Sequence, residues 1–160
     1  MKKVLLLLVA MFAFGLQNIS AQDGIKIVTN HPDLKIKVKR CAASGKTVIL
    51  DLVLNNVGVN DVEDVLVNGG NSGSEAYDDE GNIYQSDVKV RVANRTEYSG
   101  YDTGYFNIPA GVPMKLSISI EGVPQSAESI ARLKLNFRSS AWNLDRDKPV
   151  RINNIPISRD

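Results

Sequence analysis

The sequence predicts an all-β fold, and three observations lead to this fold class. Apolar and polar residues alternate along several separate segments, as in strands with one buried face. Clusters of Gly, Pro, Asn and Asp interrupt these segments at intervals of roughly 8–12 residues, the spacing of turns in sandwiches and barrels. No segment shows the repeat of a long amphipathic helix. Together they predict an antiparallel β-sandwich of about eight to ten short strands.

An export signal is predicted at residues 1–21. Lys2 and Lys3 form a positive start, the apolar run 4–14 follows, and small residues lead to a cleavage point before Gln22. This apolar run is too short for a membrane anchor, and no second long one occurs. We therefore expect a mature chain without a transmembrane segment, in the periplasm, at the cell surface or in the medium.

Charge and cysteine content narrow the classes of partner. Without the signal, 17 Lys and Arg face 18 Asp and Glu, a formal charge of −1. Nucleic acids and anionic membrane surfaces favour a clear cationic excess, so no nucleic-acid partner is expected. The single cysteine, Cys41, forms no disulfide within the chain. We expect it to be buried in a strand; the alternative is a reactive or intermolecular thiol.

Residues 22–33 are expected to form an N-terminal leader with one short strand, and residues 34–160 a single domain. The first expected strands cover 34–39, 46–55 and 62–67, with a turn at 42–45. Lys35, Lys37 and Lys39 mark a solvated face of the first strand. The second strand is apolar on both faces and is therefore predicted near the centre of a sheet.

The second half continues the pattern. Tyr77 and Tyr84 are expected to pair across a tight hairpin at 76–84. Polar loops are predicted at 68–75 and 94–104, each at an end of the domain. The remaining expected strands cover 88–92, 105–108, 114–120, 133–137 and 150–157, with a bulge at Asn153-Asn154.

Several stretches carry a family resemblance. They read KVKRCAASGKTVILDLVLNN, AYDDEGNIYQ, FNIPAGVPMKLSISIEGVP, LKLNF and KPVRINNIPI. In this order, over most of residues 34–157, the chain resembles secreted bacterial domains with an immunoglobulin-like β-sandwich of the telokin-like type, common in gut-dwelling Gram-negative anaerobes. The resemblance implies a fold and an exported location. The family has no established activity, so no catalytic residue is carried over.

Two groups of residues are candidate sites. The acidic hairpin with Asp78, Asp79, Glu80 and Asn82 offers oxygen ligands for calcium, although the same residue types also make ordinary turns. No other cofactor is expected.

The second candidate is aromatic, with members at Tyr98, Tyr101, Tyr105 and Trp142. Gathered at the surface, such rings bind sugars or protein partners; the alternative is that they pack against the core and the loops.

No catalytic constellation is recognisable. His31 is the one histidine, and it lies in the leader, where a general base would lack a rigid support. The first hypothesis is therefore an exported, non-enzymatic module that binds a protein or glycan at the cell envelope through its loops. The alternative is a hydrolase that uses carboxylates or calcium near residues 78–87, and a purely structural or inhibitor-like domain is a third possibility.

Overall fold

The computed structural model describes residues 24–29, 31–70, 73–95, 97–99, 103–139 and 149–159. The predicted signal peptide, Tyr101 and Trp142 lie outside these ranges. The all-β prediction is confirmed: the described residues form strands, turns and connecting segments without an α-helix. None of them belongs to a helix that meets the length and hydropathy of a membrane span.

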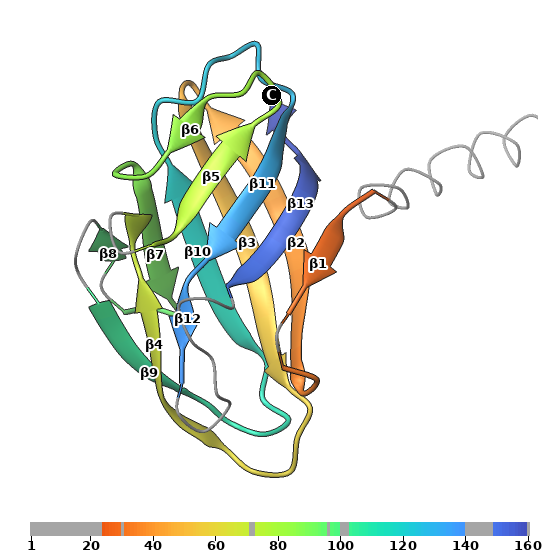
Figure 1. The fold of residues 1–160 in the computed structure, drawn as a ribbon, viewed down its shortest axis with the longest axis vertical. Coiled ribbons are helices and arrows are strands. Elements are labelled where there is room, and N and C mark those ends of the chain that lie inside the picture. The colour runs from red at the N-terminus through yellow and green to blue at the C-terminus, as the bar shows by residue number, and fades with distance from the viewer. Residues whose placement is uncertain are drawn as a thin grey trace, which may run out of the picture.

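Three sheets make up the fold (Figure 1). The five-stranded sheet has, in spatial order, β1 (Lys26–Val28), β13 (Val150–Pro156), β11 (Ser129–Leu135), β5 (Glu75–Asp78) and β6 (Ile83–Tyr84). The six-stranded sheet has β14 (Ser158–Arg159), β2 (Leu34–Ser44), β3 (Thr47–Asn56), β10 (Met114–Ile120), β7 (Val88–Val92) and β8 (Glu97–Ser99). The three-stranded sheet has β12 (Phe137–Arg138), β4 (Val62–Asn68) and β9 (Thr103–Ile108). Neighbouring strands are antiparallel except β14 and β2.

One apolar core joins the sheets. Its members are the inward-facing residues of the long strands, among them Leu50 of β3, Ile118 of β10, Leu133 of β11, Ile152 of β13 and Phe137 of β12. Each of these side chains is at most 2% exposed. Because a strand alternates its side chains between two faces, the alternation seen in the sequence places one set in this core.

The central position predicted for the strand at 46–55 is confirmed, since β3 lies between β2 and β10. Every second residue of β3 is buried and the others are half-buried. The predicted turn at 42–45 is wrong: β2 continues to Ser44, and the connection is only Gly45 and Lys46. Gly45 has φ of 59°, the left-handed conformation that a two-residue hairpin turn requires.

A bulge in β2 changes the predicted row of lysines. The register with β3 shifts between Val38 and Arg40, so Lys39 is the extra residue and Arg40 takes the place opposite Asp51. Lys39 and Arg40 are consecutive, and both are exposed. The inward-facing series then resumes at Cys41, which is buried as predicted.

Two further expectations for the second half are wrong. Tyr77 does not pair with Tyr84: the register places Tyr77 opposite Ile83 and Ala76 opposite Tyr84, so the tyrosines lie on opposite faces. The segment 94–104 is not only a loop, because it contains β8 and the start of β9.

The bulge predicted at Asn153-Asn154 does not shift the pairing of β13 with β11, whose register is the same on both sides of Asn154, but the backbone is irregular there. Asn154 has φ of 59°, and both residues lie between the buried Ile152 and Ile155. The leader prediction of one short strand agrees with β1, which pairs with β13 and thereby belongs to the five-stranded sheet.

Candidate functional site

A polar recess lies beside β7, β9 and β10. We call it the Tyr105 recess and define it by the lining residues Asp64, Ala93, Arg95, Tyr105, Asn107 and Met114. Its volume is about 320 Å³. Tyr105 and Asn107 come from β9, Asp64 from β4 and Met114 from the start of β10, so the recess lies where the three-stranded and six-stranded sheets meet.

Hydrogen bonds hold the walls of this recess in place. Arg95 donates from Nη1 to the backbone carbonyl of Tyr105 at 2.7 Å. On the β4 side, the backbone amide of Asp64 donates to Oδ1 of Asn107 at 3.2 Å. The guanidinium and the amide are therefore tied to the backbone of neighbouring segments, which fixes their positions at the recess.

Two residues of the recess have a backbone conformation that non-glycine residues rarely adopt. Ala93 and Asp64 each have φ of 51°. Left-handed backbone at an alanine costs roughly 1–2 kcal/mol, and such residues gather at ligand sites more often than elsewhere. Ala93 is held there by its amide, which donates to the carbonyl of Lys115 at 2.8 Å. The surrounding sheet thus imposes the shape of the recess.

The side chains around the recess suit a neutral polar ligand. Tyr105 is 61% exposed and offers a large apolar ring with a polar tip. The Arg95 guanidinium donates, the Asp64 carboxylate accepts, and the Asn107 amide does both. Among the described residues, no group of three His, Cys, Asp or Glu side chains is placed to hold a metal ion. The recess therefore offers groups that can bind a polar ligand.

The structure describes two of the four predicted aromatic residues. Tyr105 lines the recess, and Tyr98 lies on β8, opposite Val90 of the neighbouring β7. Tyr101 and Trp142 lie outside the described residues. Asp64, Arg95 and Asn107 were missed by the sequence prediction, because they lie on three separate segments and no spacing in the sequence connects them.

The acidic hairpin is organised around Asp78, a buried carboxylate. Its Oδ1 accepts the backbone amides of Glu80 at 3.0 Å and Asn82 at 2.8 Å, and its Oδ2 accepts Nδ2 of Asn82 at 2.8 Å and the hydroxyl of Tyr84 at 2.7 Å. Asp79 points elsewhere and accepts the backbone amide of Glu128 at 3.2 Å. The hairpin's own donors thus occupy the Asp78 oxygens that the calcium hypothesis requires.

These hydrogen bonds change how the two buried groups titrate. Burial favours the neutral form of Asp78, but the donors from Asn82, Tyr84 and Glu80 outweigh it and lower the pKa of this carboxyl. Burial, together with the adjacent Asp78 carboxylate, raises the pKa of Tyr84. Asp78 is therefore ionised and Tyr84 neutral at pH 7, which is the arrangement of a stable hairpin.

Replacing Asp78 by alanine is expected to destabilise the domain by about 2–3 kcal/mol, because buried donors lose their acceptor. Glu80→Ala, an exposed change in the same hairpin, should stay within about 0.5 kcal/mol and serves as the control in urea unfolding. The pKa of Asp78 is lower in the folded protein than in the unfolded chain. The stability that the ionised carboxylate contributes is therefore complete above the unfolded pKa of about 3.9, and it is lost as the pH falls through the lower pKa of the folded state. The free energy of unfolding of Asp78→Asn should therefore fall less between pH 5 and 3 than that of the unchanged protein. An equal pH dependence in both proteins would contradict the lowered pKa of Asp78.

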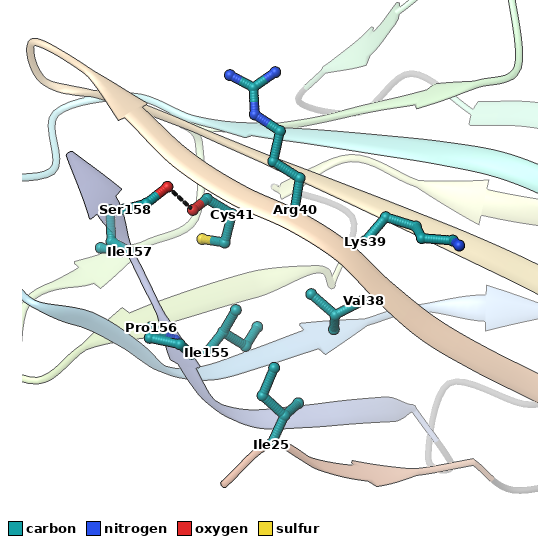
Figure 2. Close-up of a pocket in the computed structure, with 9 residues that line it drawn as sticks. All are labelled: Ile25, Val38, Lys39, Arg40, Cys41, Ile155, Pro156, Ile157 and Ser158. Carbon is teal, nitrogen blue, oxygen red and sulfur yellow. Dashed lines mark hydrogen bonds between the residues drawn. The ribbon is translucent and has the colours of Figure 1, made fainter. Parts of the chain in front are cut away.

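An apolar groove lies on the opposite flank, between β2 and the segment that joins β13 to β14. We call it the Cys41 groove and define it by Ile25, Val38, Cys41, Ile155, Pro156 and Ile157; its volume is about 370 Å³. Figure 2 shows Val38 and Cys41 pointing from β2 toward Ile155, while Arg40 points away on the other side of the strand. Ser158 donates to the Cys41 carbonyl at 3.0 Å and closes one end.

Cys41 is part of the apolar floor of this groove. Burial raises the pKa of its thiol to about 12, although the nearby Arg159 acts in the opposite direction. A thiol with this pKa stays protonated at neutral pH, and the thiolate is the nucleophilic form. Cys41 therefore serves as a small apolar side chain here.

Comparisons with known proteins give no family assignment. No protein-family model matches the chain, and no curated protein matches it. Among solved structures, a family 123 glycoside hydrolase from Clostridium perfringens is similar over 74% of this chain, with 12% sequence identity and a TM-score of 0.40. The similar part makes up 21% of that enzyme's chain. A likeness at this level supports no argument about fold or function.

Proposed function

We propose that the protein is an exported, non-enzymatic binding module that holds a glycan in the Tyr105 recess. The observation that carries the proposal is the combination of an exposed tyrosine with fixed polar groups in a recess of about 320 Å³. Sugars present hydroxyls that both donate and accept, and apolar ring faces that stack on aromatic side chains. The recess offers a counterpart for each of these features.

The fold proposed for this module is an immunoglobulin-like β-sandwich. The five-stranded and six-stranded sheets support this assignment, because they share one core and their strands pair antiparallel apart from β14 with β2. In such a scaffold the sheets stay rigid while segments at the margins carry recognition. The Tyr105 recess has this placement, because the segment after β7 contributes Ala93 and Arg95 to its lining beside residues of β9.

Export is the second part of the proposal and depends on the signal-like residues 1–21. An exported binding module needs no cofactor, and the proposed location is the periplasm, the cell surface or the medium. Mass spectrometry of the protein recovered from cell fractions tests this: a mature chain that starts at Gln22 outside the cytoplasm is the expected result. An intact Met1 in the cytoplasm contradicts it.

Tyr105→Ala is expected to weaken glycan binding at least about fivefold while leaving folding intact. The ring is mostly exposed, so its loss removes stacking area without opening the core. A single stacking contact of about 1–3 kcal/mol corresponds to roughly fivefold to 150-fold in affinity. Affinity electrophoresis against soluble neutral and acidic polysaccharides gives the ligand class, and calorimetry with its oligosaccharides gives the change in Kd.

Tyr77→Ala is the matched control, because Tyr77 is a partly exposed tyrosine on β5, away from the recess. It should bind as the unchanged protein does. Equal losses in both variants, or full binding by Tyr105→Ala, contradict the recess as the site. If no polysaccharide retards the protein in the gel, the glycan assignment is wrong and a protein ligand takes its place.

A further inference from the structure

The outer edge of β2 is the starting point of a second binding surface. β14 pairs with this edge only at Ala42 and Ala43. The same edge of β2 continues past the Cys41 groove to Leu34, and among the described strands none pairs with it from Lys35 to Lys37. An edge of this kind presents backbone groups that accept another strand.

The hydrogen-bond pattern identifies which backbone groups face outward. The amide of Val57 donates to the carbonyl of Asp33 at 2.9 Å, and the register with β3 is regular from Leu34 to Val38. Hydrogen-bonded pairs alternate along an antiparallel ladder, so Lys35 and Lys37 bond to β3. The N–H and C=O of Ile36 therefore face the outer edge.

An apolar floor lies beneath this edge. The Cys41 groove is continued by a hollow of about 100 Å³ that is lined by Ile27, Ile36 and Lys37 and shares Ile25 and Val38 with the groove. The two form one apolar strip from Ile36 to Cys41 along β2. A strand added at the edge would direct every second side chain into this strip, because side chains alternate between faces.

The outward-facing side of the same edge is cationic. Lys35, Lys37, Lys39 and Arg40 are all exposed, and none forms an ion pair with another described residue. The bulge adds to this, since it exposes Lys39 and Arg40 in succession. Although residues 22–160 are close to neutral overall, the stretch from Lys35 to Arg40 contains four Lys and Arg side chains and no acidic one.

We propose that the β2 edge and the Cys41 groove bind an extended acidic segment of another protein by strand addition. Its apolar side chains enter the groove, and its alternate acidic side chains lie beside Lys35, Lys37 and Arg40. Main-chain hydrogen bonds supply affinity in this mode, and the alternating side chains supply specificity. A second copy of this chain is disfavoured as the occupant, because two rows of lysines would face each other.

Fluorescence anisotropy tests this with a labelled ten-residue peptide in which valine alternates with glutamate. A matched peptide in which valine alternates with lysine should bind at least tenfold more weakly. Lys37→Glu should weaken binding of the acidic peptide at least tenfold. Lys46→Glu makes the same charge change at the exposed turn between β2 and β3 and should stay within twofold.

Amide hydrogen exchange distinguishes strand addition from simple charge attraction, because only strand addition gives a backbone amide a hydrogen-bond partner. The amide of Ile36 should exchange at least tenfold more slowly in the presence of saturating acidic peptide. Absence of binding, equal binding of both peptides, or an unprotected Ile36 amide overturns the proposal. Equal losses in Lys37→Glu and Lys46→Glu also overturn it, since they would indicate general electrostatic attraction.

Discussion

Phe137→Ala is expected to lower the free energy of unfolding by about 3–5 kcal/mol. Phe137 is 2% exposed and is the first residue of β12, a strand of only two residues. Its ring packs edge-on against Phe106 of β9, with the centroids 6.3 Å apart and an interplanar angle of 66°. Removing the ring leaves a cavity where the three-stranded sheet joins the core, and urea unfolding at pH 7 measures the loss.

Phe137→Leu separates the ring contact from the volume of the side chain. Leucine keeps much of the apolar volume, so this substitution should lower the free energy of unfolding by about 1–1.5 kcal/mol, close to the energy of one aromatic pair. Combining Phe106→Leu with Phe137→Leu should cost less than the two single changes added together, because both remove the same contact. A loss below about 1 kcal/mol for Phe137→Ala would show that β12 contributes little to the core.

Gly70→Ala is expected to destabilise the domain by about 3 kcal/mol or to prevent its folding. A Cβ on Gly70 would lie 1.2 Å from the carbonyl oxygen of Gln85 and 2.5 Å from its carbonyl carbon. These are backbone atoms, so no side-chain rotation relieves the overlap, and the segment before β7 must move. Circular dichroism and thermal unfolding report the effect.

Gly24→Ala is the control for this substitution. A Cβ at Gly24 meets nothing within 4 Å, so the same chemical change should alter stability by no more than about 0.5 kcal/mol. If Gly70→Ala unfolds at the same temperature as Gly24→Ala, the close approach of Gly70 to Gln85 does not exist in solution.

The segment around Gly70 also shows what the sequence could not predict. Its composition indicates an exposed polar loop at 68–75, yet Asn68, Gly70 and Ser74 are buried. The Ser74 hydroxyl donates to the carbonyl of Asn68 at 2.7 Å and accepts the amide of Asn136 at 3.1 Å. Such residues satisfy the backbone where strands leave one sheet for another, and composition alone does not distinguish this role from a flexible loop.

The strands, in contrast, were largely predictable. β3 and β10 have an alternation of apolar residues that only a strand buries on one face, and both form where expected. The hairpin at 76–84 was also located, but its tyrosine pairing was not, because a one-residue change of register moves a side chain to the other face. Of the residues that line the Tyr105 recess, only Tyr105 was predicted as a site residue, because the others come together only in the folded chain.

The two strands at the end of the chain have a consequence for the order of assembly. β13 separates β1 from β11 in one sheet, and after Ile157 the chain continues as β14 in the other. A polypeptide that emerges from its N-terminus therefore has no partner for β1 until the residues after 150 have also emerged. Contacts between such distant segments form slowly, because long loops must close first. The topology thus delays completion of the five-stranded sheet until the residues of β13 are available.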